Sequence, residues 1–440
     1  MITSVVGRTF LKAYNEKYRK DFSPKEFFEE EYWQLFFNHS KYMQWVTNSP
    51  FVQMKSGQKP HLLNEQERME KLEALYEKAG KEIPDASFAL GFPASEAKDY
   101  ASTSGLVSDL AIPVDEDEVY LSWIGSGLGI GVSRGFTILF DDAAITLQTY
   151  EGWKVYRSCL DHQALEKLRG NQVNTWNGQW LTYSMNPDEY DADFNLFDLT
   201  QQGIFKVDAS LAEVNTVNWS QLFFSLSQQF PKSEMMGYVY GFGQTNKTIG
   251  FIPFQFKAGS TIKEVYRELF GQVTDKRVFE SLFGMRFDEA CKLGSIGMLA
   301  LRPESLKSFM YDEKNLNFKK ENEIINYQAY KTWLTAMLSR TRNKEELLTY
   351  SEDVAKAIIR YKNDVTGTER RNFVEGTLFK SKIKVDFLDH LEKVIKDVME
   401  DEKVTFKNLR DNVHLMSNED CKYFITLLKF DYAYYSRETN

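Results

Sequence analysis

The sequence predicts an α+β protein with a helical N-terminal segment (1–85), a mixed α/β domain with antiparallel strands (86–300) and a C-terminal helical bundle (301–440). Three observations lead to this prediction. Apolar residues recur every three or four positions near both ends of the chain, as in amphipathic helices. The middle instead holds short β-branched runs separated by Gly and Ser. A chain of 440 residues also exceeds the size at which one core stops growing, so several domains are expected.

The N-terminal segment contains two stretches with helical spacing, residues 16–37 and 64–82. Gly80 and Pro84 are suited to end the second stretch. Asn-Ser-Pro, Ser-Gly and Lys-Pro pairs in residues 48–63 predict a loop between them.

The middle of the chain predicts strands separated by turns and two helices. The helices are expected at residues 161–170 and 218–230. The β-branched and aromatic runs that predict strands are residues 118–124, 135–140, 144–150, 203–209, 237–243 and 248–256.

From residue 261 the pattern returns to helix. The clearest apolar stripe lies in residues 384–400, and Ser417 with Asp420 resembles a capping box that starts a final helix. Several helices joined by short polar loops predict a bundle. The stripe consists of Phe387, Leu391, Val394, Ile395 and Val398.

Charge is distributed unevenly along the chain, whose net charge is −9. Residues 101–250 hold 8 Lys and Arg against 18 Asp and Glu, a balance of −10. Residues 331–384 hold 12 basic and 7 acidic side chains, a balance of +5. A basic helical face in the C-terminal region is therefore one interpretation of this charge pattern.

Cysteine usage and hydropathy predict a cytoplasmic protein that needs no disulfide, metal or cofactor. Cys159, Cys291 and Cys421 are far apart and odd in number, so they predict buried free thiols. No run of 18 uninterrupted apolar residues occurs, and Arg8 and Lys12 interrupt the apolar start of the chain. No membrane association is expected.

One motif suggests an enzyme. Gly131, Ser133 and Gly135 match the G-x-S-x-G pattern of serine hydrolases, which requires a strand, a tight turn and a helix. Here residues 135–140 predict a strand after the turn, so a glycine-rich strand connection is favoured. A hydrolase with Ser133 as nucleophile and partners from distant loops stays an alternative.

Other motifs lack the residues that their chemistry needs. The glycines of residues 125–131 alternate rather than form G-x-G-x-x-G, a spacing that lets the backbone approach another backbone or a ligand. Residues 191–202 begin like a calcium loop but have Leu196 where glycine is required. The acidic run 115–118 predicts a solvated loop, and the histidines are not grouped as metal ligands.

Two amide-rich segments are candidate recognition loops, because amides pair with base edges in DNA grooves. The first combines Asn174, Asn177 and Gln179 with two tryptophans, and the second contains Gln244, Asn246 and Lys247 at a predicted hairpin tip. The alternative interpretation is that Asn and Gly serve turn geometry while Trp176 and Trp180 fill the core.

Four arginines in the basic region are candidate phosphate contacts: Arg340, Arg342, Arg370 and Arg371. They lie among glutamates, so an ordinary solvated surface is the alternative.

Residues 351–360, 369–373 and 387–391 resemble the C-terminal helical bundle of the large subunits of type I CRISPR-associated Cascade complexes. Residues 48–51, Asn-Ser-Pro-Phe, are similar to an Asn-Pro-Phe element near the start of some of these subunits. The likeness covers about a quarter of the chain. The chain lacks the paired cysteines of the zinc-carrying relatives, and its middle is acidic where DNA would approach.

The resemblance implies a non-catalytic subunit that reads a protospacer-adjacent motif in DNA for an RNA-guided antiviral defence complex. The implied partners are other Cascade-type subunits, a guide RNA, double-stranded target DNA and a separate helicase-nuclease. The amide segments would read the motif, and the basic bundle would contact the backbone and help hold the separated strands. A hydrolase and a protein-interaction scaffold are the alternatives.

Overall fold

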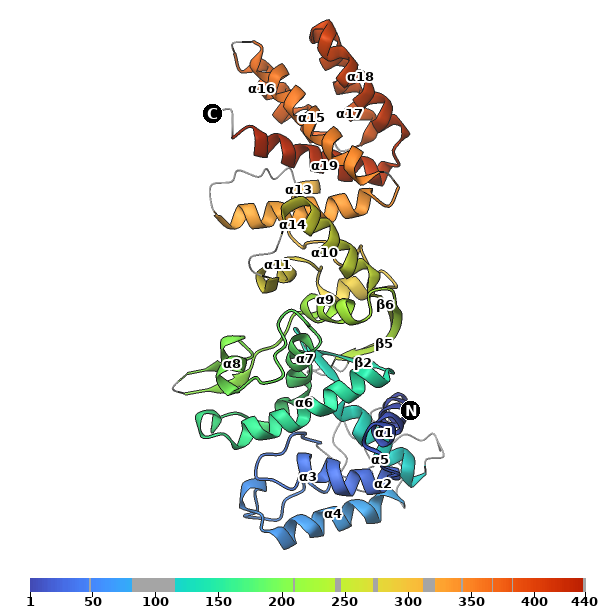
Figure 1. Cartoon of the computed structure of the whole chain (residues 1–440), viewed down its shortest axis with the longest axis vertical. Helices are drawn as coiled ribbons and strands as arrows, with labels where there is room; N and C mark the ends of the chain where they lie inside the picture. Colours follow the sequence, from blue (N-terminus) through green and yellow to red (C-terminus); the bar gives the residue numbers. More distant parts are fainter. Residues whose placement is uncertain are drawn as a thin grey trace. The chain divides into compact units, whose positions relative to one another are not determined.

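The computed structural model describes residues 1–46, 49–80, 115–208, 210–241, 247–271, 276–311, 321–341, 343–365, 367–381 and 383–437. The chain divides into two compact units, unit 1 (Met1–Phe256) and unit 2 (Lys257–Asn440), and Figure 1 labels many of their elements. The predicted α+β class is confirmed, because a small antiparallel sheet is combined with many helices.

Unit 1 begins with helices and ends with the strands β5 and β6. Ser23 starts the second helix with a full capping box, and that helix runs through a π-helical turn into α3. The helices of unit 1 are α1 (Ile2–Tyr18), α2 (Pro24–Phe27), η1 (Phe28–Tyr32), α3 (Trp33–Phe36), η2 (Pro60–Leu62), α4 (Glu65–Ala79), α5 (Glu116–Gly127), α6 (Ala143–Asp161), η5 (Gln163–Leu165), η6 (Gly170–Gln172), α7 (Val173–Ser184), α8 (Leu196–Gln201) and α9 (Trp219–Gln229).

The main sheet has four antiparallel strands in the order β1-β2-β5-β6, and a separate hairpin pairs β3 with β4. Four of the six predicted strand runs therefore form strands. The bounds are β1 (Ile130–Val132), β2 (Phe136–Phe140), β3 (Phe205–Val207), β4 (Ala212–Val214), β5 (Glu234–Gly241) and β6 (Lys247–Gln255).

Two of the predicted strands are helices instead. Residues 118–124 lie in α5, which Asp115 caps by accepting a hydrogen bond from the backbone N–H of Glu118 at 2.8 Å. Residues 144–150 lie in α6, which Asp142 caps through the N–H of Ile145 at 3.0 Å. Helix α5 is buried from Val119 to Gly127, and a short run buried on all sides has the same composition in a helix as in a strand.

Three further local predictions need correction. The acidic run 115–118 is not a loop, since its last three residues form the first turn of α5, where the helix dipole favours carboxylates. Residues 161–170 contain a 3₁₀ turn rather than an α-helix, because His162 caps only that short turn. Residues 173–180 belong to α7 rather than to a loop.

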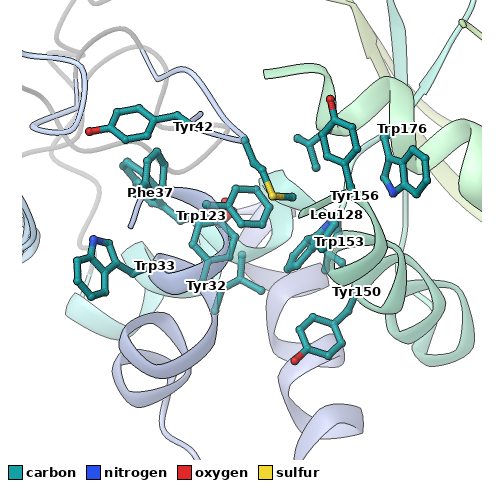
Figure 2. Packing of buried hydrophobic residues seen from close by; sticks show 14 of the residues in the cluster. Tyr32, Trp33, Phe37, Tyr42, Trp123, Leu128, Tyr150, Trp153, Tyr156 and Trp176 are labelled. Carbon is teal, nitrogen blue, oxygen red and sulfur yellow. The ribbon is translucent and has the colours of Figure 1, made fainter. Parts of the chain in front are cut away.

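The core of unit 1 is built mainly from aromatic rings contributed by helices distant in sequence. Trp153 of α6 packs edge-on against Phe36 of α3 at 4.8 Å between ring centroids, and Phe37 stacks on Phe51 at 4.0 Å. Figure 2 shows these helices directing their aromatic side chains toward a common interior. Because such rings bury large areas, this cluster supplies much of the hydrophobic stabilisation of unit 1.

Glycines allow backbones to touch in this unit, as the alternating glycines predict. Helix α1 packs along α5, and a Cβ on Gly125 would collide with the carbonyl of Thr3. Helix α7 packs on β1, and a Cβ on Gly178 would collide with the carbonyl of Gly131. Among the alternating glycines, Gly125 and Gly131 therefore serve backbone-to-backbone contact, while Gly127 and Gly129 make room for side chains.

The named elements of unit 2 are all helices, joined by turns and irregular segments among its described residues. Ser417 accepts a hydrogen bond from the N–H of Asp420 at 3.0 Å, which confirms the predicted start of α19. All five residues of the predicted stripe in α17 are buried. The helices are α10 (Lys257–Phe270), α11 (Lys276–Leu282), α12 (Phe287–Cys291), α13 (Leu306–Tyr311), α14 (Glu321–Leu338), α15 (Lys344–Asn363), α16 (Glu369–Gly376), η7 (Leu378–Lys380), α17 (Lys384–Asp397), α18 (Glu400–Leu415) and α19 (Asn418–Tyr435).

The domain boundaries after residues 85 and 300 stay predictions. In unit 1, the N-terminal helix α1 and the middle helix α5 share one core. In unit 2, α10 packs on α14, and these two helices lie on opposite sides of residue 300 in the sequence.

Candidate nucleic-acid interface

The first amide segment is built into the core of unit 1. Asn177 is fully buried and donates both amide hydrogens at 2.8 Å, to the carbonyls of Gly127 and Gly129. Gln179 donates to the carbonyl of Asn215 at 2.9 Å, and the side chain of Asn174 lies against Gly129. Trp176 and Trp180 are core residues. This packing favours the interpretation that the segment is structural, and its role in reading DNA stays a prediction.

The second amide segment is the connection of a hairpin. Strands β5 and β6 pair antiparallel, with Gly241 opposite Lys247. Gln244, Asn246 and the side chain of Lys247 lie outside the described residues. Their proposed contact with DNA therefore stays a prediction.

The four arginines that are candidate phosphate contacts differ in their surroundings. Arg370 donates to the carbonyl of Tyr361 at 3.1 Å and to Asp364 at 3.0 Å, and its guanidinium lies 4.4 Å from the centre of the Tyr361 ring. Arg371 is exposed and pairs with Glu375 at 3.2 Å. Arg340 is exposed in the turn after α14, and Arg342 lies outside the described residues. Arg370 therefore holds helix ends together.

Ser133, the hydrolase candidate, lies in the turn of the β1–β2 hairpin. Its hydroxyl donates to the side-chain oxygen of Asn218 at 3.2 Å, and Gly135 adopts a φ of +75° in the same turn. Strand β2 follows, as predicted, where a nucleophile elbow would have a helix. The hairpin thus explains the glycines of this motif.

The cysteines and the calcium-like stretch have structural explanations in the described part of the chain. The three cysteines are buried free thiols, as predicted. Asn195, within the calcium-like stretch, forms a capping box with Asp198 at the start of α8. No three His, Cys, Asp or Glu side chains among the described residues come together as metal ligands.

An open groove of about 540 Å³ lies on unit 1 along α1. Three basic and three acidic side chains line it, so its charges are balanced. It therefore favours neither anionic nor cationic ligands. The charged residues are Arg8, Lys12, Lys20, Glu16, Asp21 and Asp117.

The stronger candidate interface is on unit 2, where α15 packs against α19. Helix α15 supplies two lysines, and the last turn of α19 supplies three tyrosines. We call this set the Lys–Tyr surface: Lys356, Lys362, Tyr432, Tyr434 and Tyr435.

The lysines of the Lys–Tyr surface lie over tyrosine rings. The Lys356 ammonium is 4.6 Å from the centre of the Tyr435 ring, and the Lys362 ammonium is 5.4 Å from the centre of the Tyr432 ring. Lys356 is exposed and Lys362 is half-buried. Within the described part of the chain, neither ammonium has a carboxylate within ion-pair distance. Both charges are therefore available to an anionic ligand.

The tyrosines are held from behind by fixed contacts. The Tyr432 hydroxyl donates to Glu375 at 2.9 Å, and burial followed by the charge of Glu375 raises the pKa of Tyr432. The Tyr434 ring stacks on the ring of Tyr327 at 5.1 Å with an interplanar angle of 6°. Ordered aromatic rings beside unpaired cations are the combination that binds the bases and phosphates of nucleic acid.

The net charges of the two units favour a nucleic-acid interface on unit 2, where the Lys–Tyr surface lies. Unit 2 holds 32 Lys and Arg against 30 Asp and Glu, a balance of +2, whereas unit 1 holds 22 against 33, a balance of −11. A polyanion is therefore attracted more strongly to unit 2 than to unit 1.

Sequence reasoning missed the Lys–Tyr surface. The signal was present, because residues 429–437 combine three tyrosines with Lys429 and Arg437. Only the packing of α15 on α19 brings Lys356 and Lys362 to those tyrosines.

No family model, curated protein or solved structure matches the chain. Among the described helices, none is both long and apolar enough to cross a bilayer.

Proposed function

We propose that the chain is a non-catalytic DNA-recognition subunit of an RNA-guided antiviral defence complex, and that the Lys–Tyr surface contacts nucleic acid. The observation that carries the proposal is the pair of lysines, free of carboxylates among the described residues, over tyrosine rings in the positively charged unit. The sequence resemblance to Cascade large subunits supplies the biological setting. The partners in this proposal are other Cascade-type subunits, a guide RNA, double-stranded target DNA and a separate helicase-nuclease.

A pull-down of the tagged chain from its native host tests the biological setting. We expect guide RNA with repeat-derived ends and a backbone-forming protein partner in the recovered material. Recovery of the chain without nucleic acid contradicts the proposal.

Binding of labelled single-stranded and duplex DNA at several salt concentrations tests the surface. Changing both Lys356 and Lys362 to Ala should weaken binding and reduce the salt slope by about 1.4 on single strands, since each phosphate contact contributes about 0.7. The matched control changes Lys396 and Lys407, exposed lysines on α17 and α18, to Ala. Equal loss in both double variants would show that binding depends on net charge and not on this surface.

A protein-interaction scaffold is the second candidate, because unit 1 has an acidic segment with exposed apolar side chains. Residues 187–214 hold seven Asp or Glu and one Lys. Phe197 is 67% exposed and Val207 is 46% exposed in this segment. If the chain recovers a basic protein without RNA, and Phe197→Ser abolishes that recovery, the scaffold function is favoured.

A further inference from the structure

Behind the Lys–Tyr surface, a network of buried polar side chains links three helices of unit 2. Lys331 of α14 donates to Asp431 of α19 at 2.8 Å and to Glu352 of α15 at 3.2 Å. Ser351 donates to the second oxygen of Asp431 at 2.8 Å. Lys331 and Asp431 are 3% and 0% exposed, so this ion pair lies inside the bundle.

Stability alone is a weak reason for such a network. Desolvation of two charges offsets most of their attraction, and well-packed apolar side chains in their place often give an equally stable or more stable protein. Burial raises the pKa of Asp431 although Lys331 opposes this shift, so the cost of desolvating the carboxylate exceeds the attraction of Lys331. A buried polar network does fix how helices sit against one another, because each hydrogen bond has one acceptable geometry.

The network reaches the surface through Tyr327. The Tyr327 hydroxyl donates to the same oxygen of Asp431 that accepts from Lys331, at 3.2 Å. The Tyr327 ring is 3% exposed and forms the layer on which Tyr434 stacks. The centre of the Tyr435 ring is 5.3 Å from the centre of the Tyr434 ring, and the two rings are perpendicular. The Lys356 ammonium lies over the Tyr435 ring. A contiguous set of contacts therefore joins the buried carboxylate to the partly exposed rings of Tyr434 and Tyr435.

We propose that Lys331, Ser351 and Asp431 are positioning residues, which fix Tyr327 and through it the Tyr434 ring for contact with nucleic acid. This inference rests on the proposed function. In this proposal the buried network has a role in nucleic-acid binding that is separate from its contribution to folding.

The first test uses Tyr327→Phe, which removes the hydroxyl that reaches Asp431 and keeps the ring under Tyr434. The matched control is Tyr330→Phe, in the same helix, whose hydroxyl bonds Ser305 instead. With 3-fluorotyrosine incorporated, the ¹⁹F resonance of Tyr434 is assigned by its absence in Tyr434→Phe. We expect it to shift or broaden in Tyr327→Phe and to stay unchanged in Tyr330→Phe.

The second test separates positioning from folding. The triple variant Lys331→Met, Ser351→Ala, Asp431→Leu replaces the network with apolar side chains, and we expect a melting temperature equal to that of the wild type or higher. Its affinity for a single-stranded oligonucleotide should fall about tenfold, which is near the low end of the loss of one base-stacking contact. Tyr327→Phe should lower the affinity in the same direction, and Tyr330→Phe should not.

The outcomes distinguish the two proposals. An unchanged Tyr434 resonance in both Tyr327→Phe and the triple variant overturns the positioning role, whatever the DNA result. A wild-type chain that does not bind DNA overturns the proposed function, while the resonance still decides whether the network orders Tyr434. An altered resonance with wild-type DNA affinity also overturns the positioning role, since the ring would then not matter for binding.

Discussion

The two units reach a packed interior by different means. Unit 1 combines a large cluster of aromatic rings with glycines that let backbones touch, and it carries a charge of −11. Unit 2 packs amphipathic helices around a buried ion pair and carries a charge of +2. The difference teaches that unit 1 is most sensitive to added volume, whereas unit 2 is most sensitive to an unpaired charge.

The largest effect is expected from added volume in unit 1. Gly125→Val places a side chain where the carbonyl of Thr3 lies, so α1 and α5 must separate. We expect a loss of about 5 kcal/mol or more, at the extreme end for single substitutions. Urea unfolding followed by tryptophan fluorescence measures it, since seven of the eight tryptophans are in unit 1.

Gly376→Val in unit 2 is the control for this prediction, because no atom lies within 4 Å of a Cβ built at Gly376. Its effect on stability should stay below about 1 kcal/mol in either direction, because Val has a slightly higher helix propensity than Gly and meets no neighbour there. Similar losses at both glycines would remove the distinction between the units.

An unpaired buried charge should have the next largest effect. Lys331→Met leaves Asp431 inside the bundle without its cation, and breaking such a pair costs about 3–5 kcal/mol. Hydrogen exchange in α14, α15 and α19 measures the loss. In unit 1, Lys17→Met breaks the half-exposed pair with Glu151 and should cost less than about 1 kcal/mol. Equal costs would contradict the comparison.

Acidification should affect the two units in opposite directions at these sites. Burial opposes ionisation of Glu151, but hydrogen bonds from Tyr18 and Lys17 lower its pKa. Its contribution to stability is therefore present above the ordinary carboxyl pKa and is lost as pH falls through the lowered value. Burial raises the pKa of Asp431 despite Lys331, so its contribution is lost as pH rises through the raised value.

Hydrogen exchange at about pH 6 and about pH 4 tests the different pH dependence of the Glu151 and Asp431 sites, after correction for intrinsic exchange rates. These two pH values lie on either side of ordinary carboxyl pKa values. Helix α6 should lose protection on acidification in the wild type and lose less in Glu151→Gln. Helix α19 should lose less protection than α6. The reverse order would show that other groups dominate the pH response.

The smallest difference between the units is expected in the reactivity of their thiols, which should be low in both folded units. Burial raises the pKa of Cys159 and Cys291 to about 12 and that of Cys421 to about 11. The native protein should therefore react slowly with a thiol reagent at about pH 8 and rapidly once unfolded. In Gly125→Val, we expect Cys159 to react before Cys421. Fast reaction of the native wild type would contradict the burial of these thiols.

The sequence by itself determined the features that depend on local periodicity and capping. The stripe from Phe387 to Val398 and the cap at Ser417 are present as predicted, and strands β2, β5 and β6 follow their β-branched runs. These signals act over a few residues, so they do not depend on the rest of the fold.

Only the tertiary structure decided the state of fully buried segments and the composition of the candidate interface. Residues 118–124 form a helix in α5, although burial on all sides removes the alternation that separates helix from strand in sequence. Asn177 resembles a recognition residue in sequence but satisfies two carbonyls in the core. Lys356 meets Tyr435 because α15 packs on α19 across about 80 residues of chain, a contact that no local pattern encodes.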